Sequence, residues 1–203
     1  MTLFSDVARF NAACGVRMRD LPGWVPDDEV QLALRLVDEE RNELAAALTA
    51  RDMTEVADAI ADGLYVRAGL LLRLGIARKY ITDLLVPSAQ TPSWSVLSDD
   101  DIAGILSDLE DDDRTIRRAV TARNLIQVDT YTHRTMYALS SLAVLLRIPL
   151  DEVWQAVNDS NMAKLVDGKV VRRESDNKIL KPEGWTAPDI AGVLARHGWK
   201  QAA

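Results

Sequence analysis

The sequence predicts an all-α fold: a helical bundle built from two repeated helical hairpins, followed by an extended C-terminal tail and a short last helix. Three observations carry this prediction. Apolar residues recur at three- and four-residue steps over long stretches, strand-like alternation is scarce, and capping residues precede the periodic segments.

Two adjacent periodic segments predict the first hairpin. Apolar side chains spaced three or four apart predict a helix from Asp27 to about Ala50. Asp52 is typical of an N-cap for a second helix, with Glu55 three residues later as its capping-box partner. This second helix reaches about Leu74, and Gly75 stops it.

The following segments predict a linker and a second hairpin. A shorter helix is expected over residues 77–86, and the stretch 86–95, which contains two prolines, is typical of a loop. Ser98, with Asp101 three residues later, is typical of a helix start. Helical spacing then continues through Leu146.

The C-terminal part alternates between helix and tail. Residues 149–164 predict a helix with a proline in its first turn. Residues 166–188 are polar and lack a period, so we expect an extended tail. Thr186 and Asp189 are candidate caps of a last helix that ends at Gly198.

The chain also resembles itself at an offset of 72 residues. The tripeptide Thr49-Ala50-Arg51 recurs as Thr121-Ala122-Arg123, and apolar positions match on both sides of it. Neither hairpin can bury its apolar faces alone, so we expect the two to pack around a pseudo-twofold axis. The expected organisation is one globular unit comprising a first repeat (1–86), a second, degenerate repeat (87–165) and a C-terminal tail with a short helix (166–203).

Composition excludes several classes of function. The 203 residues include 31 acidic and 24 basic side chains, for a net charge of −7, which argues against a nucleic-acid polymer as partner. A single cysteine, Cys14, excludes an intrachain disulfide framework and a multi-cysteine zinc site. There is no apolar run long enough to span a bilayer and no visible secretory signal. We therefore expect a soluble cytoplasmic protein with neither nucleic acid nor membrane as partner.

Carboxylates of the first hairpin form two acidic strips. At about 100° per residue, Glu40 and Glu43 lie on one side of the first helix, and Glu55, Asp58 and Asp62 share one side of the next. An antiparallel hairpin brings these strips face to face. Carboxylates bordered by apolar neighbours are unfavourable unless a cation neutralises them, and Mg²⁺ prefers oxygen ligands. The pattern favours a metal site over the alternative of a solvated acidic surface.

Most of this acidity is missing from the second repeat. At the equivalent positions stand Asp112, Thr115, Gln127, Thr130 and Arg134. Arg134 puts a cation where a metal ion would lie, and we interpret the acidic run 110–113 as solvated surface. The second repeat is thus expected to be a degenerate partner kept for packing.

A family resemblance rests on ordered motifs. The EExxE motif of residues 39–43, followed after a short turn by Ala61-Asp62-Gly63-Leu64-Tyr65-Val66, resembles the all-α nucleoside triphosphate pyrophosphohydrolases. These include MazG-like, phosphoribosyl-ATP pyrophosphohydrolase-like and dimeric dUTPase proteins. The C-terminal motifs SNMAKL (160–165), DGK (167–169) and KPEGW (181–185) are similar to the MazG-like branch with dUTP pyrophosphatases. The resemblance covers about residues 5–76 and 148–198, with an inserted second copy between them.

The resemblance implies a reaction and a metal site. Such enzymes cut between the α and β phosphates, giving a nucleoside monophosphate and pyrophosphate. Glu39, Glu40 and Glu43 match the motif that binds Mg²⁺ or Mn²⁺, and one glutamate, Glu39 or Glu40, would orient or deprotonate the attacking water. The resemblance thereby implies a hydrolase that depends on a divalent cation.

One motif departs from the family pattern. Asp62 matches the aspartate of an ExxD motif, but Ala59 stands where its glutamate is expected. Either Glu55 or Asp58 supplies the missing oxygen, or metal affinity is reduced and catalysis is weak or lost.

The C-terminal motifs supply candidate substrate contacts. Asn161 and Lys164 match family residues that would contact sugar or phosphate. An acidic pocket needs basic groups for a triphosphate, and Lys164 and Lys181 are the candidates from the tail. Trp185 is a candidate for stacking on a base, although tryptophans near prolines also pin loops.

We therefore expect a metal-dependent (d)NTP pyrophosphohydrolase. The tail motif favours dUTP by resemblance, with dGTP or a damaged base as the main rival. The alternative is a catalytically weak or inactive protein of this fold that binds a nucleotide or a regulatory partner. One chain would do the work of a family homodimer, and two such chains are expected to pair.

Overall fold

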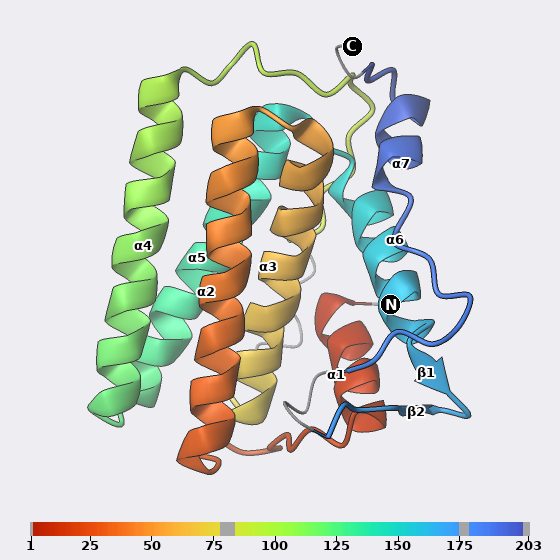
Figure 1. Ribbon diagram of the computed structural model, residues 1–203. Helices are drawn as coiled ribbons and strands as arrows, with labels where there is room; N and C mark the ends of the chain where they lie inside the picture. The colour runs from red at the N-terminus through yellow and green to blue at the C-terminus, as the bar shows by residue number, and fades with distance from the viewer. Residues whose placement is uncertain (1, 78–83, 175–178, 201–203) are drawn as a thin grey trace.

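The computed structural model describes residues 2–77, 84–174 and 179–200 (Figure 1). Within them the chain forms seven helices and one two-stranded sheet, which confirms the all-α class. Helices α2 (Asp27–Ala50) and α3 (Met53–Arg73) form the first hairpin, and α4 (Asp99–Thr121) and α5 (Leu125–Leu146) form the second. α3 packs on α5 and α2 on α4, so the two hairpins make the predicted bundle.

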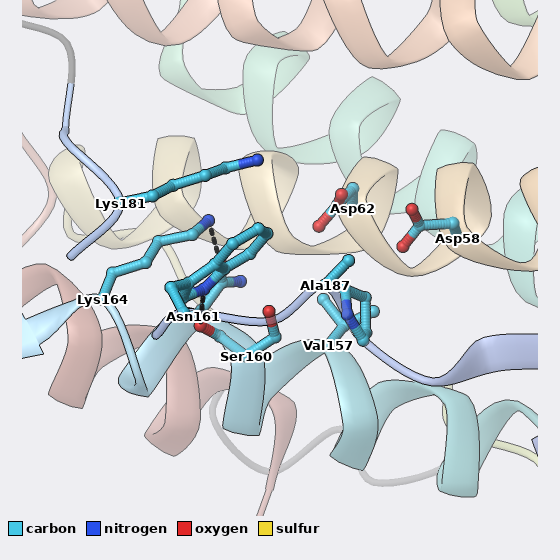
Figure 2. Close-up of a pocket in the computed structure, with 10 residues that line it drawn as sticks. Asp58, Asp62, Val157, Ser160, Asn161, Lys164, Lys181 and Ala187 are labelled. Carbon is cyan, nitrogen blue, oxygen red and sulfur yellow. Dashed lines mark hydrogen bonds between the residues drawn. The ribbon is translucent and has the colours of Figure 1, made fainter. Parts of the chain in front are cut away.

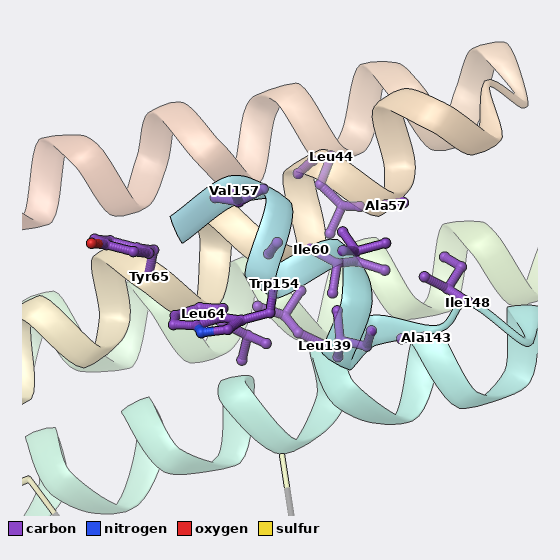
Figure 3. Close-up of a cluster of buried hydrophobic side chains, with 14 of the residues drawn as sticks. Leu44, Ala57, Ile60, Leu64, Tyr65, Leu139, Ala143, Ile148, Trp154 and Val157 are labelled. Atoms are coloured by element: carbon purple, nitrogen blue, oxygen red, sulfur yellow. The ribbon is translucent and has the colours of Figure 1, made fainter. Parts of the chain in front are cut away.

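Helix α3 is the centre of the molecule, because three further helices cover its remaining surface. These are α1 (Leu3–Ala13), α6 (Leu150–Met162) and α7 (Ile190–Arg196). The main apolar core lies where these elements meet, and it includes Leu64 and Leu139 (Figure 3). Trp154 of α6 stacks on Tyr65 at 5.3 Å between ring centroids and donates its indole N–H to Asp6 of α1 at 3.1 Å. The first hairpin is thereby anchored to both α1 and α6.

Contacts between the hairpins are reciprocal. The Arg51 guanidinium lies 5.4 Å from the centroid of Trp94 and pairs with Asp99 at 2.7 Å. Arg123, 72 residues after Arg51, lies over Trp24 at 4.8 Å and pairs with Asp27, which is 72 residues before Asp99. Both arginines adopt the left-handed backbone conformation, with φ of 51° and 53°. A twofold relation between two copies produces such paired contacts, so they support the duplication, which stays a proposal.

Two elements were not predicted. Helix α1 begins in a capping box between Thr2 and Ser5, and its buried face consists of Leu3, Phe4, Val7 and Phe10 with two polar residues. The expected extended tail contains a small hairpin, in which β1 (Leu165–Val166) pairs with β2 (Lys169–Val170). Asp167 and Gly168, with φ of 50° and 76°, form its turn, a conformation that this pair of residues favours.

Three local expectations meet different outcomes. The Asp52 carboxylate caps α3 as predicted, but the Asp52 amide donates to the Ala47 carbonyl, so Glu55 forms no capping box and stays exposed. The helix expected over 77–86 falls largely outside the described residues, and 84–86 are not helical. No helix of the described part is long and apolar enough to cross a membrane.

The interpretation of residues 110–113 as solvated surface is wrong for half of the run. Glu110 and Asp111 are exposed and pair with Arg114, as a surface run would. Asp112 and Asp113 are buried, at 4% and 2% exposure, because arginines from α5 and α3 pair with them. The second hairpin therefore keeps two buried charges.

Candidate functional site

A pocket of about 220 Å³ lies between α3, α6 and the C-terminal segment 181–188 (Figure 2). Two walls of opposite charge define it. Asp58 and Asp62 of α3 form the acidic wall, while Lys164 and Lys181 belong to the opposite wall. The remaining lining residues are Val157, Ser160, Asn161, Trp185, Ala187 and Pro188.

Helical spacing places the two aspartates of the acidic wall on one side of α3, four residues apart. Burial, together with the charge of Glu55, raises the pKa of Asp58 to about 6. Burial and the charge of Asp58 raise the pKa of Asp62 to about 7, against the opposing effect of the Lys164 ammonium. Asp58 Oδ1 is buried and finds no hydrogen-bond partner among the described residues.

Glu40 of α2 faces this wall. Burial raises its pKa to about 8, and the charge of Asp62 is the largest of the carboxylate contributions that add to the rise. Within the described part of the chain, Glu40 Oε2 is also buried without a hydrogen-bond partner. The acidic strips of α2 and α3 therefore lie close enough to repel each other.

The six candidate carboxylates do not form one cluster. Glu39, Glu43 and Glu55 are exposed, and none of the glutamates lines the pocket. Among residues 2–77, 84–174 and 179–200, no three His, Cys, Asp or Glu side chains are arranged to hold a metal ion. Ala59 is buried in the apolar core at 5% exposure.

The donor chemistry nevertheless fits a hard divalent cation. Burial, together with repulsion from nearby carboxylates, raises the pKa values of Glu40, Asp58 and Asp62, and two of the three have a buried oxygen without a hydrogen-bond partner among the described residues. A hard cation such as Mg²⁺ would neutralise that repulsion and accept those oxygens as ligands.

The last turn of α6 holds the opposite wall in place. Lys164 Nζ donates to Asn161 Oδ1 at 2.7 Å, and the Trp185 indole N–H donates to the Ser160 carbonyl at 2.9 Å. The Ser160 hydroxyl donates to the Thr186 carbonyl at 3.2 Å. These bonds fasten the C-terminal segment to α6 beside the pocket.

The Trp185 ring contacts both lysines of the pocket. Lys181 Nζ lies 4.0 Å from the ring centroid and Lys164 Nζ lies 5.7 Å from it, both within the range of cation–π attraction. Burial and the Lys181 charge lower the pKa of Lys164, while Asp62 opposes that change. Trp185 thus gathers two ammonium groups at the pocket.

Sequence reasoning missed Ser160 and the apolar residues of the lining. A signal for Ser160 was present, because Ser160 and Asn161 precede Lys164 by four and three residues, which are the spacings of side-chain neighbours on a helix. Glu55 and Asp58 likewise have the ExxD spacing, one turn before the position that was compared with the family.

Comparison with known families bears on the first hairpin. Residues 7–86 match the family model of phosphoribosyl-ATP pyrophosphohydrolase, which lies in the MazG-like superfamily. This match confirms the resemblance for the segment that carries Glu40, Asp58 and Asp62, and it supports pyrophosphohydrolase activity in general. No curated protein matches the chain.

Proposed function

We propose that this protein is a metal-dependent nucleoside triphosphate pyrophosphohydrolase that releases pyrophosphate and leaves a nucleoside monophosphate. The observation that carries the proposal is the pocket with a carboxylate wall on α3 and a lysine wall formed by Lys164, just after α6, and Lys181 of the tail. One wall suits a divalent cation and the other suits phosphate oxygens, and a metal–triphosphate complex requires both.

The carboxylates would hold Mg²⁺ or Mn²⁺. Glu40, Asp58 and Asp62 are the inner ligands we assign, with Glu39, Glu43 and Glu55 at the exposed margin. Such an ion, when bound, neutralises phosphate charge and lowers the pKa of a water molecule. Asp58, which lines the pocket, would supply the carboxylate of the family glutamate that Ala59 replaces.

Proton transfer falls to the glutamates of α2. Glu40 or Glu39 would orient the attacking water or accept its proton, as a positioned carboxylate does in general base catalysis. Because the buried Oε2 atom of Glu40 is assigned to the cation, the proton would go to the other oxygen of this carboxylate, Oε1, or to Glu39.

The lysine wall would bind the phosphate chain. Lys164 and Lys181 provide two ammonium groups, and the Asn161 side chain keeps Lys164 in place. The pocket of about 220 Å³ is smaller than the range of roughly 300–1,000 Å³ of typical ligand sites, so we assign it to the phosphates. Base and sugar would then extend beyond it.

We propose the substrate class from the chemistry that the two similar protein families share. The matched family is named for the hydrolysis of phosphoribosyl-ATP, and the tail motif is similar to that of dUTP pyrophosphatases. Both substrates carry a triphosphate, so we propose a (d)NTP, with dUTP and dGTP as the first candidates. Pairing of two chains stays a prediction, which sedimentation tests.

The test is pyrophosphate release from a panel of (d)NTPs and phosphoribosyl-ATP, with and without Mg²⁺ or Mn²⁺. We expect metal-dependent release, abolished by Glu40→Gln and unchanged by the matched control Glu110→Gln on the exposed face of α4. Nucleotide binding without any product would instead support the alternative of a binding or regulatory protein. The exposed positions of Glu39, Glu43 and Glu55 are the observation that favours this alternative.

A further inference from the structure

A buried ion pair joins the second hairpin to the first. Both carboxylate oxygens of Asp113 in α4 accept from Arg67 Nη2 of α3 at 3.0 Å, and the two side chains are 1% and 2% exposed. Arg67 also donates to the Gly63 carbonyl at 3.2 Å and to the Thr135 hydroxyl at 3.0 Å. Asp113 is thus linked through Arg67 to the backbone of α3.

Asp113 also reaches α2. Arg41 Nη1 lies 3.5 Å from Asp113 Oδ2, and the same atom lies 3.5 Å from Asp38 Oδ1. Asp38 in turn pairs with Arg117 of α4, whose guanidinium donates to the Leu34 carbonyl at 3.0 Å. One polar network, buried at Asp113 and Arg67 and partly exposed at Asp38 and Arg117, therefore ties α2, α3 and α4 together.

The attachment points lie next to the acidic strips. Arg41 directly follows Glu40 in the sequence, and the carbonyl that Arg67 holds belongs to Gly63, which directly follows Asp62. If α2 or α3 moved, the contacts of this network would lengthen at a residue directly beside a candidate metal ligand. The separation of Glu40 from Asp62 is thereby coupled to Asp113.

We propose that Asp113 is a positioning residue: through Arg41 and Arg67 it fixes the distance between Glu40 on α2 and Asp62 on α3, so that both can bind one divalent cation. This inference rests on the proposed function. It assigns the second hairpin a task beyond packing, since a residue of that hairpin sets the geometry of a site on the other.

The relation between the repeats shows why a single chain permits this arrangement. Arg41 and Asp113 are separated by 72 residues, the offset of the repeats, so they occupy equivalent positions that touch. Contacting equivalent residues lie at a twofold axis. Identical chains would place two arginines or two aspartates there, whereas this chain places an arginine against an aspartate.

The test compares neighbouring acids that differ in what they hold. Asp113→Asn cuts the link to α2 and α3, while Asp112→Asn breaks a pair with Arg134 inside the second hairpin. Mn²⁺ affinity of the full chain is measured by calorimetry. We expect a loss of about tenfold or more for Asp113→Asn, as for residues that orient metal ligands, and less than about twofold for Asp112→Asn.

Two further variants separate positioning from stability. Arg41→Gln removes the α2 link at a side chain that is 20% exposed and leaves the buried Asp113–Arg67 pair intact. The double variant Asp113→Leu with Arg67→Met removes both buried charges, a change that generally preserves stability. Both variants are expected to fold and still to bind Mn²⁺ several-fold more weakly than the unaltered chain.

The outcomes are distinct. Mn²⁺ affinity in Asp113→Asn and Arg41→Gln equal to that of the unaltered chain would overturn the positioning role alone. Recovered affinity in the double variant would also overturn it, because Asp113 would then act only through stability. No Mn²⁺ binding by the unaltered chain would overturn the proposed function together with this inference.

Discussion

The two hairpins share a scaffold and differ in how their matched charges are balanced. In the first, burial and the nearby charge of Asp62 raise the pKa of Glu40. In the second, Asp112 and Arg134 occupy the equivalent positions, and Arg134 Nε donates to Asp112 at 2.7 Å. At these two positions the second hairpin pairs its charges internally, whereas the first keeps two carboxylates that an external cation would balance.

Transplanting the second hairpin's charge into the first gives the largest expected effect. Asp62→Arg places at position 62 the residue type found at position 134. Pyrophosphate release is expected to fall to background because the metal site gains a cation. The free energy of unfolding in urea should change by no more than about 1 kcal/mol, because Glu40 gains an ionic partner while Lys164 loses one.

The reverse exchange is its control. Arg134→Asp should destabilise the protein, because Asp112 is buried and loses its partner, while pyrophosphate release stays. Metal-dependent activity retained by Asp62→Arg would break the comparison between the two hairpins.

The pH dependence of stability should also distinguish the hairpins. In the metal-free protein, the folded-state pKa of Glu40 is about 8, above its ordinary value of 4.5. Its stabilising contribution is therefore complete below about pH 4.5 and is lost as pH rises through about 8. The melting temperature should fall over that window by about 2–4 °C for each kcal/mol lost.

Saturating Mg²⁺ is expected to flatten this profile, since the cation favours the charged carboxylates. Without metal, Glu40→Gln should reduce the loss of stability and leave the contributions of Asp58 and Asp62, whose pKa values are also raised, while Glu110→Gln on the exposed face of α4 should leave the profile unchanged. A metal-free protein that gains stability from pH 5 to 8 would contradict the electrostatic account of the first hairpin.

A smaller effect is expected at Trp185, where the tail contributes to the proposed site. Trp185→Leu removes the ring that gathers Lys164 and Lys181, an attraction worth about 0.5–2 kcal/mol. KM should rise about three- to tenfold with kcat unchanged, equally for all nucleotides. Trp94→Leu, which alters a ring between the hairpins, should leave KM as it is. A loss confined to one base would instead support stacking of Trp185 on that base.

The smallest effects probe the shared scaffold. Trp24→Leu and Trp94→Leu each remove the ring under one of the reciprocal arginines. We expect similar losses of unfolding free energy, about 1 kcal/mol each, from urea titrations. If the two losses differ by more than about 1 kcal/mol, the two contacts are not energetically equivalent, and the twofold relation holds for the backbone alone.

Local signals explain which parts of the fold could be predicted. The bounds Asp27–Ala50 were available because helical periodicity and flanking residues are local properties. The Thr2–Ser5 box of α1 and the Asp167–Gly168 turn were also local, so both elements could have been recognised. The burial of Asp113 could not, since Arg67 lies 46 residues away along the chain.

The same distinction applies to the candidate site. Helical spacing and the family motifs predicted Asp58, Asp62, Asn161 and Lys164 as site residues, and all four line the pocket. The separation of the exposed glutamates from the pocket depends on side-chain packing between helices, which spacing does not specify. The contact of Trp185 with Lys181 depends on how the tail folds back onto α6.

The contact between Arg41 and Asp113 bears on how such a molecule can evolve. In a homodimer every substitution appears twice, so a residue change that favours catalysis burdens both halves with its cost in stability. A single chain with two unlike halves can divide that trade-off, leaving unbalanced carboxylates in one hairpin and well-paired charges in the other. Selection for activity and selection for folding can then act on different helices of one molecule.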